Sequence, residues 1–292
     1  MHKFVLVTLV LTLVVMTCTT EQNAPKKQTG YCLISYNVWY GFTRVPERKP
    51  DWLLWMQEQA PDFVALQELN GYDVDQLKED ARQWGHDHSV LLKEDGFPTG
   101  LTSRFPIQDV KIYRDGFHHG LLRATINRFY FYVIHLHPSN WQFRHQEISR
   151  ILADIRSLPK NASIFLVGDF NTFSRHDSLF YAHGRLEPFF QTRDAEYNEQ
   201  NLKNGTLDYT VLDQLMNAGF IDLEFSQRGQ DYQFTGSFPT KIEKPGDHGS
   251  QRRLDYVFAT ANLAERIIRA DIVADERTWR LSDHLPMLVV FE

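Results

Sequence analysis

Apolar residues occur along the chain in short runs separated by turn-forming residues, a pattern that predicts alternating strands and helices. The clearest helical spacing is that of Phe143, Ile148, Ile151 and Ile155. The predicted strands are 32–38, 63–67, 90–93, 100–103, 110–114, 121–126, 129–135, 164–167, 254–258, 267–273 and 287–291, and the predicted helices are 51–59, 74–84, 140–158 and 210–218.

This mixture of strands and helices predicts an α/β (α+β) fold in which helices cover two packed sheets, a four-layered sandwich with mainly antiparallel strands. Residues 31–292 contain no internal repeat, no low-complexity tract and no abrupt change of composition. We therefore expect one catalytic domain over 31–292, with the polar stretches 197–205 and 241–250 as loops inside it.

The N-terminal segment differs from the rest of the chain. An apolar run, 4–16, follows His2 and Lys3, and it is shorter than the ~20 residues that a membrane-spanning helix needs. Residues 1–17 are therefore predicted to be a signal peptide. Cys18 and the polar tether 18–30 follow, and this order resembles a bacterial lipoprotein signal, although Thr17 is a looser match before the cysteine.

If Cys18 carries lipid, the protein is exported and anchored to a membrane of the cell envelope by its acyl chains. The alternative is ordinary secretion, with a periplasmic or secreted product. In the lipidated form Cys32 has no cysteine left to pair with, because the chain contains only two. Cys32 lies in an apolar strand and is predicted to be a small buried residue.

Composition narrows the class of protein. A hydrophobic share of 42% with 21 Phe among 292 residues is ample for a large core, which excludes a disordered chain. The net charge of −6 gives no general attraction to polyanions, and no basic run marks a nucleic-acid binder. A local basic cluster in the fold stays open as an alternative, and the expected state is a monomer.

Polar residues at the ends of apolar strands are the most informative feature, because a strand end holds a side chain rigidly at a shared cleft. Each of them has an ordinary explanation when taken alone, such as a turn former, a helix cap or a solvated carboxylate. They occur in the segments 35–39, 66–68, 134–136, 168–171, 253–256 and 282–286.

In combination and in order, these segments resemble the endonuclease/exonuclease/phosphatase superfamily, whose members share a deoxyribonuclease-I-like fold. The resemblance extends from Cys32 to Phe291. Its most specific strings are Gly-Asp-Phe-Asn at 168–171 and Ser-Asp-His-Leu-Pro at 282–286, with support from Leu-Gln-Glu at 66–68, Leu-Asp-Tyr at 254–256 and the segments 100–107 and 121–124.

The chemistry of phosphate-ester hydrolysis also asks for these residue types. A hard cation brings the phosphate and a water together, and Mg²⁺ prefers one or two carboxylates with waters. We expect Glu68 as the primary metal carboxylate, with Asn37 and Asp283 adding oxygens beside it. The available donors are mainly oxygens, which favours Mg²⁺ or Mn²⁺.

The resemblance implies the catalytic roles. Asp169 would orient or deprotonate the attacking water, and Asn171 would hold that water or a phosphate oxygen. His284 would lie beside the scissile phosphate, with Asp255 bonded to its far nitrogen. His135 matches a second histidine of the family that contacts phosphate or protonates the leaving oxygen.

Residues that neighbour the predicted catalytic groups have alternative interpretations. His137 is the alternative to His135 as the second histidine of the family, although Pro138 places His137 in the following loop. His118 and His119 are expected at the surface, because adjacent strand residues point to opposite faces. The predicted substrate-binding residues, whose aromatic members could instead pack in the core, are Trp39, Arg104, Arg123, Asn140 and Arg144.

The leading hypothesis is a divalent-metal-dependent phosphodiesterase or phosphatase that acts outside the cytoplasm on a small molecule or a lipid headgroup. An extracytoplasmic DNA or RNA nuclease with the same active site is the alternative. A non-catalytic binding protein is a third, poorer hypothesis, because none of the expected catalytic residues is missing. The sequence has neither a Gly-x-Ser-x-Gly elbow nor a Gly-x-x-x-x-Gly-Lys loop.

Overall fold

The computed structural model describes residues 30–182, 184–230 and 232–292. The predicted signal peptide, Cys18 and the predicted tether up to residue 29 lie outside these ranges. Among the helices that are described, none combines the length and the apolar character that crossing a membrane requires.

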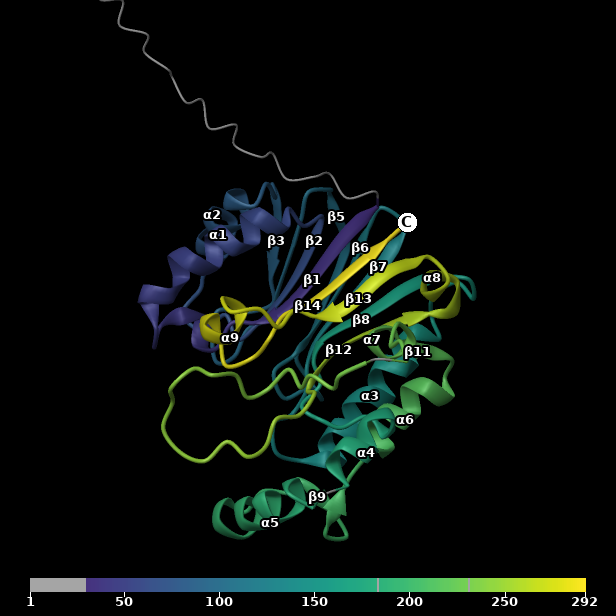
Figure 1. Cartoon of the computed structure of the whole chain (residues 1–292). Coiled ribbons are helices and arrows are strands. Elements are labelled where there is room, and N and C mark those ends of the chain that lie inside the picture. Colours follow the sequence, from purple (N-terminus) through teal and green to yellow (C-terminus); the bar gives the residue numbers. More distant parts are fainter. Residues whose placement is uncertain (1–29, 183, 231) are drawn as a thin grey trace, which may run out of the picture.

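Two six-stranded sheets form the centre of the fold (Figure 1). Neighbouring strands are antiparallel, except that β1 pairs with β2 and β7 pairs with β8 in parallel. The first sheet has the order β13 (Ile267–Ile272), β14 (Met287–Phe291), β1 (Tyr31–Asn37), β2 (Phe63–Gln67), β4 (Gly100–Ser103), β3 (His88–Leu91). The second has the order β11 (Phe220–Asp222), β12 (Asp255–Thr260), β8 (Ser163–Asp169), β7 (Phe129–His135), β6 (Leu121–Ile126), β5 (Ile107–Tyr113).

Helices cover the outer face of each sheet, so that the predicted four-layered sandwich is confirmed (Figure 1). Helices α1 (Lys49–Gln59) and α2 (Val74–Gln83) lie on one side, and α3 (Trp141–Ile155) and α6 (Thr210–Asn217) on the other. Three apolar clusters fill the spaces between these layers. On β1, for example, Leu33 faces the cluster between the sheets and Ile34 the cluster under α1, because successive side chains of a strand point to opposite faces.

The apolar pattern predicted the main elements closely. The predicted strands 63–67 and 129–135 coincide with β2 and β7, and the predicted helix 140–158 contains α3, whose first turn is capped by Asn140. The pattern did not predict α5 (Leu186–Tyr197), β11 or the short elements η1 (Tyr40–Phe42), η2 (Pro46–Arg48), η3 (Arg175–Asp177), α4 (Ser178–Tyr181), β9 (Leu202–Lys203), β10 (Thr206–Leu207), α7 (Leu223–Ser226), α8 (Ala261–Ala264) and α9 (Thr278–Leu281).

One glycine sets the spacing of the strands that carry the site. Gly168 is paired with Ile134 across β8 and β7 and has a φ of 142°. A Cβ at this position would lie 1.9 Å from the carbonyl oxygen of Ile134. Only glycine fits such a close backbone approach. The next pair in the register is His135 and Asp169, so the glycine fixes how these two side chains enter the cavity.

Candidate active site

Three neighbouring strands of the second sheet bring polar side chains to one edge. Asp169 at the end of β8 is paired with His135 of β7 on one side and with Asp255 of β12 on the other. All three side chains are buried. The Oδ2 atom of Asp169 lies 3.7 Å from Nε2 of His135. Strand pairing therefore gathers three of the predicted catalytic residues into one row.

The first sheet contributes Asn37 and Glu68 from the ends of its parallel strands β1 and β2. The amide nitrogen of Asn37 donates hydrogen bonds of 3.1 Å to both Glu68 and Asp169. Its amide oxygen accepts a hydrogen bond from the backbone N–H of Trp39, which fixes the orientation of the amide. Asn37 thus acts in this structure as a donor between two carboxylates, and its predicted role as an oxygen ligand stays a prediction.

The loop before β14 supplies Asp283 and His284. Ser282 anchors this loop, because its hydroxyl donates to the carbonyl oxygen of Asn37 over 2.7 Å. Nδ1 of His284 lies 2.7 Å from Oδ2 of Asp255, and Nε2 lies 3.8 Å from Oδ2 of Asp169. The imidazole is therefore held between two carboxylates that come from adjacent strands.

The protonation of these buried groups follows from their surroundings. Burial opposes the charged imidazole of His284, but the carboxylates of Asp255, Asp283 and Asp169 outweigh it and raise its pKa to about 10. Burial raises the pKa of Asp169 to about 7, against the effect of His284. Burial and the negative charge of Asp283 raise the pKa of Glu68. His284 is therefore charged at neutral pH, and Asp169 is placed to take up a proton there.

The remaining predicted catalytic residues border the same space. The amide nitrogen of Asn171 donates to the carbonyl oxygen of Leu136, and its backbone N–H donates to Asp169. Burial and the neighbouring His119 hold the pKa of His135 well below its usual range, so His135 is neutral. His137 lies in the loop after β7, where its Nδ1 accepts from the N–H of Ser139.

The expectation that His118 and His119 lie at the surface holds for only one of them. His119 is 6% exposed, and its ring stacks on that of His135 with centroids 4.0 Å apart. His118 is exposed and packs against His137. The two rings have centroids 4.4 Å apart and both line the site cavity, because residues 118 and 119 lie in a bend before β6 and not in a strand.

A cavity of about 500 Å³ opens over these groups. The predicted residue Trp39 lines it, and so do Tyr40 and Phe97. The sequence analysis did not predict the part of the lining that comes from α5 and the loop before β12. Its residues carry no motif that would mark them, and they are Phe189, Phe190, Arg193, Phe238, Lys244 and Arg252.

Four of the predicted substrate-binding residues do not line this cavity. Arg104 follows β4, which is antiparallel to β2, and therefore lies at the opposite edge of the sheet, paired with Asp62. Arg123 is buried against α3 and pairs with Asp154. Arg144 is also buried, donating to the carbonyl oxygen of His137, and Asn140 caps α3. These side chains support the fold around the site.

The donor set fits a hard divalent cation. Glu68 and Asp169 are held within 3.1 Å of the same amide nitrogen, with a raised pKa on each carboxyl. The buried Oδ1 atom of Asp283 has no hydrogen-bond partner among the described residues. Asp169, Asp255 and His284 also lie within 4.8 Å of one another. Since the His284 imidazole is charged and bonded to Asp255, it is a poor ligand, and the predicted carboxylate ligands Glu68 and Asp283 are the better candidates for holding a cation.

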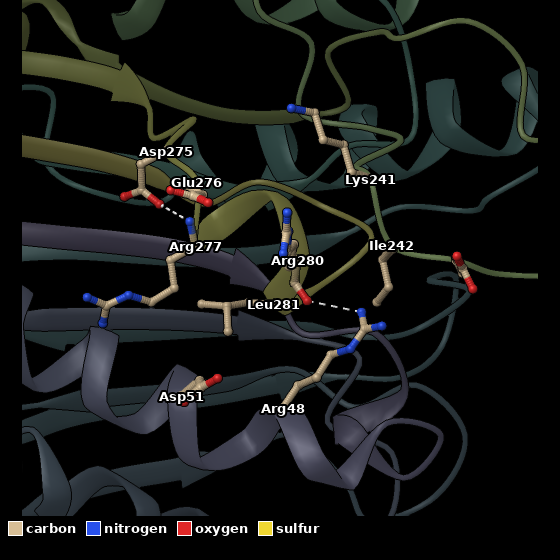
Figure 2. Close-up of a pocket in the computed structure, with 10 residues that line it drawn as sticks. Arg48, Asp51, Lys241, Ile242, Asp275, Glu276, Arg277, Arg280 and Leu281 are labelled. Atoms are coloured by element: carbon tan, nitrogen blue, oxygen red, sulfur yellow. Dashed lines mark hydrogen bonds between the residues drawn. The ribbon is translucent and has the colours of Figure 1, made fainter.

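A second, larger cavity of about 900 Å³ lies elsewhere, between α1, α9 and residues 241–243 (Figure 2). Its charged side chains are of both signs. Arg48 donates to the carbonyl oxygen of Arg280, and Arg277 pairs with Glu58 at 2.8 Å. The cavity is open and lacks a buried acid beside a histidine, so the catalytic chemistry belongs to the cavity at the strand ends.

Comparison with known proteins agrees with this geometry. The model of the endonuclease/exonuclease/phosphatase family matches residues 34–284. No curated relative matches the chain in sequence.

Similar solved structures share the fold. One is an AP endonuclease from Archaeoglobus fulgidus, with a TM-score of 0.64, 19% identity, and coverage of 90% of this chain and 99% of that chain. Another is the 3′ phosphatase NExo from Neisseria bound to a product DNA hairpin, with a TM-score of 0.63, 18% identity, and coverage of 90% and 99%. A third is TDP2 from D. rerio complexed with a single-strand DNA product, with a TM-score of 0.63, 19% identity, and coverage of 91% and 100%.

Proposed function

Because the chain belongs to the endonuclease/exonuclease/phosphatase family, and is thus a phosphoric ester hydrolase, we propose that it hydrolyses a compact phosphate ester with the help of Mg²⁺ or Mn²⁺. The observation that carries this proposal is the row His135, Asp169 and Asp255 at the base of one cavity. His284 is bonded to Asp255, and Glu68 shares the amide of Asn37 with Asp169. A buried carboxylate can accept a proton from an attacking water, and a charged imidazole beside it can stabilise a phosphate anion.

The acidic residues would hold the cation and prepare the water. Glu68 and Asp283 are the residues that would hold it, and Asp169 accepts from the same Asn37 amide nitrogen as Glu68. When bound, a divalent cation lowers the pKa of a water and withdraws charge from the phosphate oxygens. Asp169 accepts the proton of the attacking water, since its pKa of about 7 leaves much of the carboxyl ionised at neutral pH.

The histidines and Asn171 act on the phosphate. The charged His284 donates from Nε2 to a phosphate oxygen and stabilises the charge that develops there, while Asp255 fixes the ring through Nδ1. The neutral His135 faces Asp169 and can donate to a second oxygen. Asn171 has its amide nitrogen bound to Leu136, which leaves its amide oxygen for the water.

The shape and charge of the site support a small substrate or a lipid headgroup. The cavity is lined by aromatic rings from separate segments, among them Trp39, Tyr40, Phe189 and Phe238. Such a compact, aromatic-lined space suits an ester of limited size better than an extended duplex. The net charge of −6 also gives no general attraction to nucleic acid.

A nuclease is the second candidate, and one specific observation favours it. Two of the similar structures, those of NExo and TDP2, are bound to DNA products. The same acidic row and histidines would cleave a phosphodiester of a single strand whose end reaches into the cavity. The binding of such a strand would weaken steeply as salt increases, which separates this candidate from hydrolysis of a small ester.

Hydrolysis assays on the purified chain test the proposal. The substrates are bis-p-nitrophenyl phosphate, p-nitrophenyl phosphate, sphingomyelin, inositol phosphates, plasmid DNA and RNA, each with Mg²⁺, Mn²⁺ or EDTA. We expect metal-dependent release from a compact ester, lost in Asp169→Ala. Cleavage of nucleic acid alone would select the second candidate, and inactivity of a folded, metal-binding chain on every substrate would contradict both.

We also propose that the protein is exported, tethered to a bacterial membrane by a lipid on Cys18, and monomeric. The apolar run 4–16 and the cysteine after it support this location. Labelling cells with a radioactive fatty acid would mark the wild type, and Cys18→Ala would lose both the label and the membrane fraction. Unchanged membrane association of Cys18→Ala would contradict a lipid anchor, and size-exclusion chromatography with light scattering tests the monomer.

A further inference from the structure

Arg252 is a buried cationic residue on the wall of the active-site cavity. It lies just before β12 and is 6% exposed. Its Nη1 atom donates to the main-chain oxygens of His248, over 2.7 Å, and Ser250, over 3.0 Å. Its Nε atom has no hydrogen-bond partner in the described part of the chain. A guanidinium that is buried in this way keeps an unused donor.

Two other cations of the cavity wall, Arg193 and Lys244, are neutralised, whereas the buried Arg252 is not; Arg44, which also lines the cavity, is exposed and lies over the Tyr40 ring. Arg193 pairs with Glu199 at 2.5 Å, and Lys244 pairs with Asp283 at the same distance. The adjacent Arg253 pairs with Asp222 at 2.6 Å. Arg252 forms no ion pair with any residue that the structure describes. Burying a charge without a partner is costly, and here it lowers the pKa of Arg252 to about 10. An anion that entered the cavity would supply the missing partner.

Aromatic rings hold this guanidinium in place. Its Cζ atom lies 5.4 Å, 5.3 Å and 4.7 Å from the ring centroids of Phe189, Phe190 and Phe238. The backbones of Phe238 and Arg252 are also hydrogen-bonded to each other. Rigid, apolar surroundings strengthen the attraction between a cation and an anion, because little water screens it. The guanidinium of Arg252 is therefore placed to bind an oxyanion, and the surrounding rings are placed to contact an organic group attached to it.

This position adjoins the place proposed for the scissile phosphate, on another part of the same aromatic ring. The Phe238 ring contacts both the Arg252 guanidinium and the His284 imidazole, whose ring centroid is 4.8 Å away. One aromatic side chain thus stands next to both groups. A phosphate beside His284 and a second anion beside Arg252 fit within one small molecule with a short spacer between them.

We propose that Arg252 binds a second oxyanion of the substrate, a phosphate or carboxylate group carried a short distance from the scissile ester. The rings of Phe189, Phe190 and Phe238 contact the organic part that joins the two groups. This inference rests on the proposed function, since it assumes that the cavity hydrolyses phosphate esters. It adds that the substrate carries two anionic groups, of which one is cleaved.

The test uses three p-nitrophenyl phosphodiesters whose second alcohol is propyl, 2-carboxyethyl or 2-phosphoethyl. The wild type is expected to have a kcat/KM at least about tenfold higher for an anionic ester than for the propyl ester, because a hydrogen bond to a charged group contributes that much. Arg252→Gln should reduce this preference to near equality. Arg104→Gln removes an arginine at the opposite edge of the sheet and should keep it.

The outcomes separate the two proposals. Equal rates for the three esters in the wild type, or an unchanged preference in Arg252→Gln, would overturn the second-anion site while hydrolysis itself stands. Hydrolysis of none of them would overturn this inference, and inactivity on p-nitrophenyl phosphate and the other substrates named above as well would overturn the proposed function. If Arg252→Gln does not fold, Arg252→Lys keeps the charge without the planar fork and should show an intermediate preference. The larger effect, from carboxylate or from phosphate, identifies the group.

Discussion

The Oδ2 atom of Asp255 lies 2.7 Å from Nδ1 of His284, and both side chains are buried. Because the imidazole is charged, its Nδ1–H donates this bond, and the opposite nitrogen is turned toward Asp169. The hydrogen bond therefore runs from His284 as donor to Asp255 as acceptor. Asp255 sets the orientation of a ring whose other nitrogen would face the phosphate in the proposed reaction.

Asp255→Asn should keep the fold but lower kcat by about 10²-fold or more, because the imidazole of His284 loses the carboxylate that raises its pKa and fixes its orientation, and so loses its action as a charged donor. The steady-state rate and the melting temperature measure the two effects. Proton NMR of the imidazole distinguishes a positioning role from a structural one, since the signal of the Nδ1-bound proton should shift or disappear. A variant that is fully active would place the catalytic histidine elsewhere.

Glu68→Gln should weaken metal binding and activity together. The substitution keeps the size of the side chain but removes the charge that faces the cation. We expect the Kd for Mn²⁺, measured by isothermal titration calorimetry, to rise at least about tenfold, since the loss of an outer partner of a ligand already costs about 10–100-fold. Glu47→Gln alters an exposed carboxylate and serves as the control. An unchanged Kd would remove Glu68 from the metal site.

His86 should make the stability of the protein dependent on pH. Its Nδ1 accepts a hydrogen bond from the indole N–H of Trp84, and burial lowers its pKa to about 4. Between pH 4 and 6.5 the unfolded chain therefore binds the extra proton. The stabilisation is complete above pH 6.5 and is lost as the pH falls toward 4, by roughly 3 kcal/mol.

Urea unfolding from pH 7 to pH 4.5 measures this effect in the wild type and in His86→Gln. Other groups also titrate in this range, so the comparison is between the two slopes. The wild type should lose more free energy of unfolding than the variant as the pH falls. Parallel slopes would show that His86 does not carry the dependence.

Arg253→Leu should destabilise the fold by about 3–5 kcal/mol, since it leaves the buried Asp222 without an arginine partner, while Asp177 and Glu224 keep Arg228. Arg253 is fully buried and bonds Asp177, Asp222 and Glu224. Arg175→Leu is the matched control, because it breaks an exposed pair with Asp213, which is expected to contribute less than about 1 kcal/mol. Similar unfolding free energies for the two variants would contradict a structural role for Arg253.

The sequence was sufficient for the parts of the fold in which local pattern and tertiary structure agree. The strands β2 and β7 are apolar runs bounded by turns, so their limits could be predicted. Helix α5 could not, because its buried residues Leu186 and Phe190 pack in a separate cluster and its sequence shows no clear apolar face.

The catalytic row could be predicted for a similar reason. Asp169 lies at the end of a strand and His284 in the loop before one. Polar residues in short motifs at such positions indicate a functional site. Arg252 carries no such signal, since an Arg-Arg pair looks like a solvated surface until α5 folds over it. Arg104 was misplaced because the direction of β4, which decides the edge at which the residue lies, is a property of the sheet.

The separate packing of α5 bears on how such a protein changes over generations. The reacting groups are held by the central strands, whereas Phe190 and Phe238 belong to a cluster that also includes Leu254. Substitutions in α5 can change the part of the cavity lining that α5 contributes. They would not disturb the three apolar clusters that pack between the layers of the fold. Selection can therefore retarget the protein to a new ester while it inherits the same reaction machinery, and divergence should concentrate in residues 186–197.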